Sequence, residues 1–421
     1  MVLTDRETDC VPFPCFFLRL EKESAILYIM SREKKAVKKP KTKKKTDYYD
    51  YSLLAVIILL TCFGLVMLYS TSSYMAELNY GDDMYYFKKQ AAISFGCIII
   101  ALGISQIDYH ILTKFTGVLY GMAAILMMLV KTPLGRTANG ARRWLNLGPL
   151  SFQPSEVAKI AVIVCLSYMI VNMGRNIKTL KAFMILAGSG SALAFLAYAC
   201  TDNLSTAIII FCITMGLIFI AHPKVKPFLI AAGVGIVLII IFVMILSSSL
   251  ETSSSFRLRR ILVWLHPEDF ASGDGYQTIQ ALYAIGSGGF LGRGLGNSIQ
   301  KLGSVPEAQN DMIFSIVCEE LGILGGIILL LLFAYLLYRL FFIAQNAPDM
   351  FGSLMVSGIF IHIALQVIFN IAVVLNLMPN TGVTLPFVSY GGTSIVFLMS
   401  EMGLALSVAR QIKFKEPERL L

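Results

Sequence analysis

Residues 257–320 read RLRRILVWLHPEDF at 257–270, GDGYQ at 273–277, AIGSGGFLGRGLGNSIQK at 284–301 and PEAQNDMIFSIVCEE at 306–320. This polar, glycine-rich block lies between strongly apolar segments. Connections longer than about 15 residues without a helical pattern are usually functional or disordered. The tryptophan, the tyrosines and the tight-turn glycines favour order. We therefore interpret the block as the working part of an integral membrane protein.

Outside this block the chain is dominated by apolar runs. Apolar residues make up 56% of the 421 residues and charged residues 14%, with a mean hydropathy of +0.72. Runs of about 17–25 apolar residues can cross a hydrocarbon core of about 30 Å as helices, which pair all their backbone groups internally. The sequence therefore predicts an all-α polytopic membrane protein with ten transmembrane helices. They are expected at 51–71, 91–107, 112–130, 157–173, 182–199, 204–221, 228–246, 312–343, 350–378 and 393–409.

The net charge of +9 comes mostly from the N-terminal tail, where nine basic residues lie between 31 and 45 beside Glu33 alone. Directly before a span, such a tail holds the N-terminus in the cytoplasm against anionic lipid. This interpretation is favoured over nucleic-acid binding. We expect a basic cytoplasmic tail at 1–47 and a membrane domain at 48–421. Met30 followed by SREKK would be a more ordinary start, so residues 1–29 are interpreted as a mis-called extension or an added segment.

Ten spans return the C-terminus to the cytoplasm as well, which places 248–311 outside as a long loop between spans 7 and 8. Basic residues favour cytoplasmic connections, yet this loop and the connection after span 3 are both rich in arginine. An anionic ligand at the outer face explains these residues. Contact with anionic lipid of the outer leaflet is the alternative.

The eight cysteines and four histidines show neither CxxC nor zinc-ligand spacing. A disulfide framework and a protein-ligated metal site are therefore not expected.

The first functional cluster is NGARRWLNLGPLSFQPSEVAKI at 139–160. Pro154 suits the first turn of a helix, whose N-terminus favours anions. Arg142 and Arg143 lie just upstream, and guanidinium groups match phosphate oxygens. Glu156 and Lys159 share one helical face near the membrane boundary. They are candidate substrate-binding residues, and the alternative is a structural ion pair.

The second cluster lies within the long block. The run GSGGFLGRGLG lacks the GK[ST] of a phosphate-binding loop, so it indicates close backbone approach to a substrate or to another helix. Lys301, Glu307 and Asp311 follow it, and an aspartate at a helix start is usually an N-cap. Of Glu319 and Glu320, one is expected to face the bundle interior and to pair with a basic residue or hydroxyl.

The third cluster, PNTGVTLPFVSYGGTS at 379–394, is expected to form a rigid turn at the outer face. Thr393 and Ser394 are expected to cap the following helix. Glu401, in mid-span, is a candidate for an internal polar contact.

These clusters together resemble the SEDS family (shape, elongation, division and sporulation), polytopic enzymes that polymerise the bacterial cell wall. The resemblance runs from about 51 to 410 and rests on GARRW with FQPSE, GYQ with AIGSGG, GLGNSIQK, PEAQND with EELG, and TLPFVSYGGTS. GARRW and GLGNSIQK look more like the division and sporulation branch, of FtsW/SpoVE type, than the elongation branch. Two departures are Gln309-Asn310 before Asp311, and Asn203 where the family usually has aspartate.

The resemblance implies a peptidoglycan glycosyltransferase in the bacterial cytoplasmic membrane, with Asp311 as its catalytic residue and with inversion at the anomeric carbon. It also implies ten transmembrane helices, lipid II as the substrate, and a class B penicillin-binding protein and other divisome proteins as partners. Chain growth requires the 4-hydroxyl of one sugar to attack the anomeric carbon of another, and one carboxylate suffices as base. Asp311 is the best-placed base, and Glu307 is the reserve.

The departing pyrophosphate needs positive charge, which Arg142, Arg143, Lys301 or a divalent cation (Mg²⁺ or Mn²⁺) could supply. A lipid II flippase without glycosyl transfer is the main alternative, because several mid-span residues are polar. A non-catalytic scaffold is the second alternative. Both predict that Asp311 is dispensable for polymerisation.

Overall fold

The computed structural model describes residues 49–138, 141–147, 150–223, 230, 233, 256–273, 275–303 and 305–413. The chain divides into one unit at Met1–Thr46 and a second at Asp47–Leu421, and the description below concerns the second. The expected basic tail at 1–47, including the segment 1–29, and the expected span at 228–246 lie outside the described residues.

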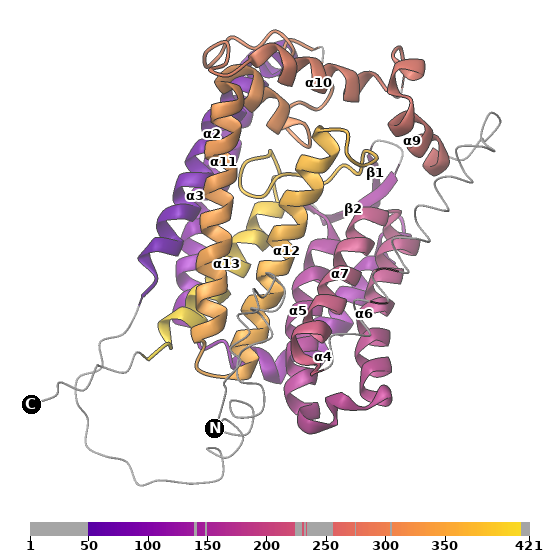
Figure 1. The fold of residues 1–421 in the computed structure, drawn as a ribbon, viewed down its shortest axis with the longest axis vertical. Coiled ribbons are helices and arrows are strands. Elements are labelled where there is room, and N and C mark those ends of the chain that lie inside the picture. Colours follow the sequence, from indigo (N-terminus) through magenta and orange to yellow (C-terminus); the bar gives the residue numbers. More distant parts are fainter. Residues whose placement is uncertain are drawn as a thin grey trace, which may run out of the picture. The chain divides into compact units, whose positions relative to one another are not determined.

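The described residues form a bundle of long apolar helices (Figure 1). Eight of the helices in these ranges are long and apolar enough to cross a membrane. They are α2 (Tyr51–Tyr80), α3 (Tyr85–Gln106), α4 (Ile111–Leu129), α5 (Pro154–Met173), α6 (Leu180–Thr201), α7 (Leu204–Ala221), α11 (Ile313–Asn346) and α12 (Met350–Val374). The expected tenth span is the shorter α13 (Ser394–Arg410). The chain is therefore a multi-pass helical membrane protein, and the total of ten spans stays a prediction.

Helix α12 holds the bundle together, because it packs against α5, α7, α11 and α13. Around it, α11 packs against α2, α2 against α3, and α3 against α13. On the other side, α5 packs against α4, α6 and α7. Figure 1 shows α12 between these two groups, below α10. Side chains of α12 can therefore contact four other helices of the bundle.

Two connections are more regular than the sequence suggested. The connection after α4 forms a three-stranded antiparallel sheet of β1 (Gly135–Ala138), β2 (Ala141–Leu147) and β3 (Leu150–Phe152), so the all-α expectation is corrected here. The long block, expected to lack a helical pattern, contains α9 (Phe256–Leu265), the short η3 (Pro267–Phe270) and α10 (Tyr276–Gly288). Helix α10 packs against α11 and α12, so the block is attached to the bundle.

Helix α11 is broken at Gly322, whose backbone adopts φ 69° and ψ −172°. An unbroken helix would pair the Glu319 carbonyl with the Ile323 N–H and the Glu320 carbonyl with the Leu324 N–H. The break frees these four groups about 13 Å along the helix from its start. Each of them then pairs with the glycine-rich segment 289–294.

The replacement bonds form a short backbone ladder. The N–H groups of Arg293 and Gly294 donate to the Glu319 and Glu320 carbonyls at 3.0 and 2.9 Å. In return, the N–H groups of Ile323 and Leu324 donate to the carbonyls of residues 289 and 290 at 3.0 and 3.2 Å. Irregular backbone at membrane depth is tolerated only when protein satisfies it in this way. The glycine run therefore makes the expected close approach to a helix.

We predict that Gly292→Ala destabilises the protein by about 2–4 kcal/mol, because a methyl group there would lie 2.2 Å from the Glu320 carbonyl and at φ +80°. Thermal unfolding of the purified protein in detergent measures the effect. Gly103→Ala is the matched control, since a methyl group there meets nothing within 4 Å. Equal unfolding temperatures for the two variants would contradict the importance of this contact.

Candidate active site

Asp311 lies just before α11, at the edge of the block. The N-cap of α11 is Met312, one residue later, so the interpretation of Asp311 as a helix cap is wrong. Burial raises the pKa of the Asp311 carboxyl to about 6, and the negative charge of Glu307 adds to the shift. A hydrogen bond from its own backbone N–H and, to a smaller extent, the positive charge of Arg260 act in the opposite direction. A carboxyl with this pKa can exchange a proton near neutral pH.

The turn at 379–392 is folded against the loop that carries Asp311. The Asn370 side chain on α12 donates to the backbone carbonyls of Asp311 and Val383, at 2.7 and 2.8 Å. The Tyr390 N–H donates to the Gln309 carbonyl at 2.9 Å. A methyl group added at Gly382 would lie 3.9 Å from Asp311 Oδ2. The backbone of the turn therefore forms one wall beside the carboxylate.

Asn370 belongs to a buried polar stripe on α12, together with His362 and Gln366 at four-residue spacing. Gln366 Nε2 donates to the Thr384 carbonyl at 3.1 Å, which fixes a second point of the turn. His362 Nδ1 lies 2.8 Å from a carboxylate oxygen of Glu401, so the expected polar contact of Glu401 is confirmed. One face of α12 thus positions both the turn and α13.

A cavity of about 290 Å³ lies beside Asp311, between α9, α10 and the turn. Gln277 lines this cavity, and its Nε2 atom lies 3.5 Å from Asp311 Oδ1. The Asn380 side chain donates to Gln277 Oε1 at 2.9 Å, and the Asn380 carbonyl accepts from Arg260 Nη1 at 3.2 Å. Gln277 and Asn380, the latter through both its side chain and its backbone carbonyl, therefore connect the Asp311 carboxyl with the Arg260 guanidinium of α9.

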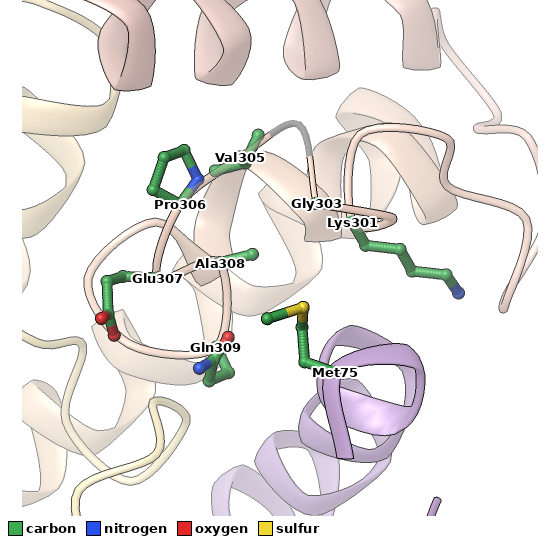
Figure 2. A pocket seen from close by; sticks show the side chains of 8 residues that line it. All are labelled: Met75, Lys301, Gly303, Val305, Pro306, Glu307, Ala308 and Gln309. Atoms are coloured by element: carbon green, nitrogen blue, oxygen red, sulfur yellow. The ribbon is translucent and has the colours of Figure 1, made fainter. Parts of the chain in front are cut away.

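Glu307, the reserve base, lies in the same loop as Asp311 with a left-handed backbone, at φ 55°. Its carboxylate accepts a hydrogen bond from Asn310 Nδ2. It also lines a smaller cavity of about 120 Å³ that reaches Met75 and the stem of Lys301 (Figure 2). The negative charge of Glu307 acts on Asp311 from this side.

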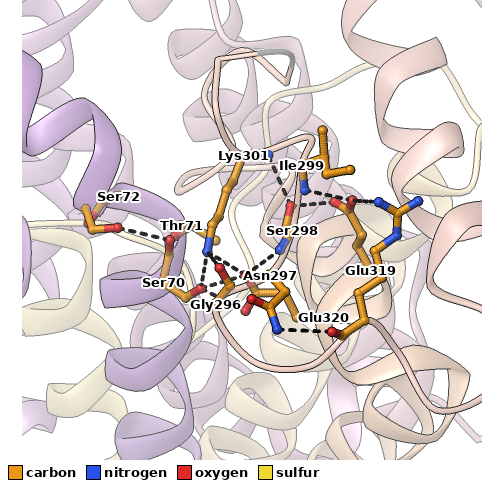
Figure 3. Close-up of polar contacts among 12 residues, drawn as sticks. Ser70, Thr71, Ser72, Gly296, Asn297, Ser298, Ile299, Lys301, Glu319 and Glu320 are labelled. Carbon is orange, nitrogen blue, oxygen red and sulfur yellow. Dashed lines mark hydrogen bonds and ion pairs between the residues drawn. The ribbon is translucent and has the colours of Figure 1, made fainter.

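Lys301 points away from Glu307 and into a buried network (Figures 2 and 3). Its Nζ atom lies 2.9 Å from Glu320 Oε1 and donates to Ser70 Oγ at 2.9 Å. Neighbouring Glu319 accepts from Ser298 Oγ and from the N–H of residue 299. Both carboxylates are fully buried, so the pairing expected for one of them occurs for both. Lys301 therefore holds the block to α2 and α11, and contact with a substrate phosphate would require breaking this ion pair.

The two arginines of the first cluster are separated by their strand. Arg142 and Arg143 are consecutive in β2, and consecutive residues of a strand point to opposite faces. Arg142 Nη1 donates to the Lys131 carbonyl at 3.2 Å, and Arg143 Nη2 donates to the Asp202 carbonyl at 3.4 Å. Burial lowers the pKa of Arg143, and the nearby charge of Arg260 lowers it further. Arg143 and Arg260 therefore lie close enough for their charges to interact.

Glu156 and Lys159 form a buried ion pair of 2.9 Å in the first turns of α5, which begins at Pro154 as expected. This geometry agrees with the structural alternative, in which the two residues satisfy each other. Asn203 caps α7, because its side chain accepts from the Thr206 N–H at 3.1 Å. Asparagine and aspartate cap about equally well, so the missing charge leaves the helix start intact. Thr393 occupies the N-cap position of α13, but its side chain makes no capping hydrogen bond, and its hydroxyl donates instead to the Ser151 carbonyl at 3.3 Å. Ser394 is the first residue of α13 and does not occupy the cap position.

Four residues around Asp311 were not recognised from the sequence as its neighbours. Arg260 counted among the arginines of the long loop and Asn370 among the polar mid-span residues, whereas Gln277 and Asn380 were not singled out. Three of them lie in segments quoted above, RLRR, GYQ and PNTG, but the sequence did not show that they converge. Among the described residues, no three His, Cys, Asp or Glu side chains lie together as a metal site.

The family model described as cell cycle protein, covering FtsW, RodA and SpoVE, matches residues 50–414. Stage V sporulation protein E of Bacillus subtilis is 36% identical over 374 residues, which is 89% of this chain and all of the relative. The probable peptidoglycan glycosyltransferase FtsW of Trichlorobacter lovleyi is also 36% identical, over 87% of this chain and 94% of the relative.

Two solved structures extend the comparison. A chain of a peptidoglycan synthase complex, described as structurally coordinating polymerization and crosslinking, has a TM-score of 0.70 and 26% identity, over 86% of this chain and 98% of that one. The rod shape determining protein RodA of Thermus thermophilus has a TM-score of 0.62 and 26% identity, over 87% and 98% of the two chains.

We predict that Asn370→Leu lowers the free energy of unfolding by about 1–3 kcal/mol, because it leaves two carbonyls without their donor in a buried setting. Thermal unfolding measures the loss, and faster amide exchange at residues 380–392 should accompany it. Asn346→Leu is the matched control, because its single bond to the Phe342 carbonyl is solvent-exposed. If amide exchange in the turn is unchanged, Asn370 does not position it.

Proposed function

Because the chain belongs to the cell cycle protein family of FtsW, RodA and SpoVE, we propose that it polymerises lipid II into glycan strands at the outer face of the cytoplasmic membrane. The membership makes it a peptidoglycan glycosyltransferase of cell division or sporulation. The identity of the substrate, the side of the membrane and the residue roles are our proposals.

The observation that carries the proposal is the surroundings of Asp311. Its carboxyl lies outside the helix start, beside a cavity, and has a pKa of about 6. An ordinary surface carboxylate, with a pKa near 4, would be a weaker base. A carboxylate that caps a helix would instead accept hydrogen bonds from the N–H groups of the first helical turn. This arrangement is suited to accepting a hydroxyl proton at neutral pH.

In the proposed reaction, Asp311 takes the proton of the attacking sugar 4-hydroxyl. The hydroxyl oxygen bonds to the anomeric carbon of a second lipid-linked sugar, and undecaprenyl pyrophosphate leaves with the bonding electron pair. Arg143 is our first choice for the phosphates, because it shares its surroundings with Arg260 near Asp311. Arg142 lies on the other face of β2 and is proposed for a more distant part of the substrate.

In this proposal the other predicted substrate-binding residues support the site without contacting the reacting atoms. Lys301, Glu156 and Lys159 are buried in ion pairs that fix the block and the start of α5. Glu307 raises the pKa of Asp311 and lines the smaller cavity, so it tunes the base. A divalent cation bound jointly by protein and substrate phosphates stays a proposal.

A class B penicillin-binding protein is the proposed partner, acting with other divisome proteins. One solved neighbour belongs to a complex that coordinates polymerization with crosslinking, and crosslinking is the step that a transpeptidase would supply. A flippase is the alternative, favoured by the polar residues within spans. The polar side chains of α12 and α11 pair within the protein, as His362–Glu401 and Lys301–Glu320 do, which supports a structural role for them.

We predict that Asp311→Asn lowers polymerisation by about 10²–10⁴-fold, the usual contribution of a general base. Glycan formation from labelled lipid II by the purified protein with its partner measures this. Binding of lipid II and of the partner should persist, because asparagine keeps the size of the side chain. Long glycan chains made at a near-normal rate would sink the assignment of Asp311 as the base and favour Glu307, the reserve base.

The pH dependence gives an independent check on the same base. Only the ionised carboxylate accepts the proton, so with a pKa of about 6 the rate should fall as the pH drops from 7 to 5. Glu307→Gln removes a charge that raises this pKa, so the acid limb should move to lower pH. A limb that stays in place would show that Glu307 does not act on the titrating group.

We predict that Ser272, exposed in the turn before α10, lies outside the cell, and that Lys178, exposed in the short helix η2 (Gly174–Lys178) after α5, lies inside. A cysteine at Ser272 should react with a membrane-impermeant maleimide in intact cells. A cysteine at Lys178 should react only after the membrane is opened. The reversed pattern would place the site on the cytoplasmic face and overturn the proposal.

A further inference from the structure

The cavity between α9, α10 and the turn, here called the α9–α10 cavity, has a composition of its own. Trp264 and Tyr276 give it aromatic surface, and Gln277, Asn376 and Asn380 give it amide groups. Arg260 supplies a cation, and the described residues that line the cavity include no carboxylate. A volume of about 290 Å³ is at the lower end of ligand pockets, so it suits one ring-sized group.

This lining selects a chemical class of ligand. Aromatic faces cover the apolar face of a pyranose ring, and amides both donate and accept for hydroxyl and acetamido groups. A guanidinium group recognises phosphate oxygens, usually through two parallel hydrogen bonds. A cavity with all three and no carboxylate fits a neutral sugar that bears a phosphate.

The position of the cavity fits a particular sugar in the reaction. Gln277 touches Asp311, and Asn380 joins Gln277 to Arg260. The wall therefore runs from the proposed base at one end to a cation at the other. Inverting displacement needs the attacking hydroxyl and the leaving group on opposite sides of the anomeric carbon. Base and cation should accordingly lie apart, with the donor sugar between them.

We propose that the α9–α10 cavity binds the phosphate-linked sugar of the donor, with Arg260 on the leaving pyrophosphate. This inference rests on the proposed function and deepens it. The new bond joins the acceptor oxygen to the donor anomeric carbon, and the bond from that carbon to the pyrophosphate oxygen breaks. The hydroxyl proton goes to Asp311, and the electron pair stays on the pyrophosphate, whose added charge Arg260 stabilises.

Arg143 supports this assignment from the neighbouring sheet. Burial lowers the pKa of Arg143, repulsion by the charge of Arg260 lowers it further, and the charge of Asp202 raises it. A bound anion would add to the relief of this repulsion that Asp202 provides. The pair of guanidinium groups near the site is thus Arg143 with Arg260, which are 117 residues apart in the sequence.

The first test measures how undecaprenyl pyrophosphate, the product, competes with fluorescent lipid II for the full-length protein. Arg260→Gln should weaken its binding by about 10- to 100-fold, the usual loss for a charged hydrogen bond. Arg260→Lys keeps the charge and should lose less. Arg136→Gln, which removes an exposed arginine on β1, is the control and should bind like the parent. Unchanged product affinity in Arg260→Gln would overturn the proposal.

The second test leaves Arg260 unchanged, so it remains valid if the Arg260 variants do not fold. Gly273 lines the cavity, and a methyl group there would lie 4.0 Å from its nearest neighbour, so Gly273→Cys should be tolerated. Undecaprenyl pyrophosphate should slow maleimide labelling of this cysteine relative to labelling of the same variant without product. A cysteine at exposed Ser272, the adjacent residue, should label equally with and without product. Equal labelling of both cysteines in the presence of product would contradict occupancy of the cavity.

Both tests measure binding, so they separate this inference from the proposed function. If Asp311→Asn stops polymerisation while Arg260→Gln keeps full product affinity, the glycosyltransferase mechanism stands and the cavity assignment fails. If product binds in the cavity while Asp311→Asn still polymerises, the cavity assignment stands and another residue is the base.

Discussion

The polar block at 257–320 depends on the four backbone hydrogen bonds between the broken part of α11 and segment 289–294. A membrane-spanning helix normally keeps its backbone groups to itself, because an unpaired group in hydrocarbon costs several kcal/mol. At Gly322 this rule produces an attachment, because the freed groups bond to the backbone of segment 289–294. Gly288 and Gly292 allow the close approach, because a methyl group there would lie 2.0 and 2.2 Å from the carbonyl oxygens of Cys318 and Glu320. The buried Lys301–Glu320 ion pair adds charge to the same junction.

From this junction the position of Asp311 follows. The block leaves the junction, passes Lys301 and returns to α11 through the loop at 305–311, so both ends of the loop are anchored. The α12 stripe then fixes the opposite wall, with Asn370 bonded to the Asp311 carbonyl and to the turn. The carboxylate is placed by groups that are buried and paired. Catalytic groups held by such rigid surroundings lose little free energy to reorganisation during reaction.

Much of this could be predicted from the sequence, because hydrophobic runs set helices and because the motifs of the block are specific. The start of α5 at Pro154 and the polar contact of Glu401 followed from local rules. What failed were statements about which side chains meet in space. Arg142 and Arg143 look like a pair in the sequence, but a strand separates adjacent residues, whereas the fold brings Arg143 near Arg260. Lys301 looked like a phosphate ligand in the sequence. Its pairing with Glu320 could not be predicted, because the break in α11 and the burial of Glu320 depend on the backbone conformation of one residue, Gly322.

The same limits explain the capping predictions. Asp311 lies one residue before the N-cap of α11, and Thr393 occupies the N-cap position of α13 without a side-chain capping bond, because tertiary partners determine the local structure. Asp311 is held in a partly buried position between the charges of Glu307 and Arg260. Burial and Glu307 hold the proton on, and Arg260 helps to release it. A group so balanced can bind a proton in one step and lose it in the next at neutral pH, which a cap on the dipole of a helix, stabilised as an anion, could not do as readily.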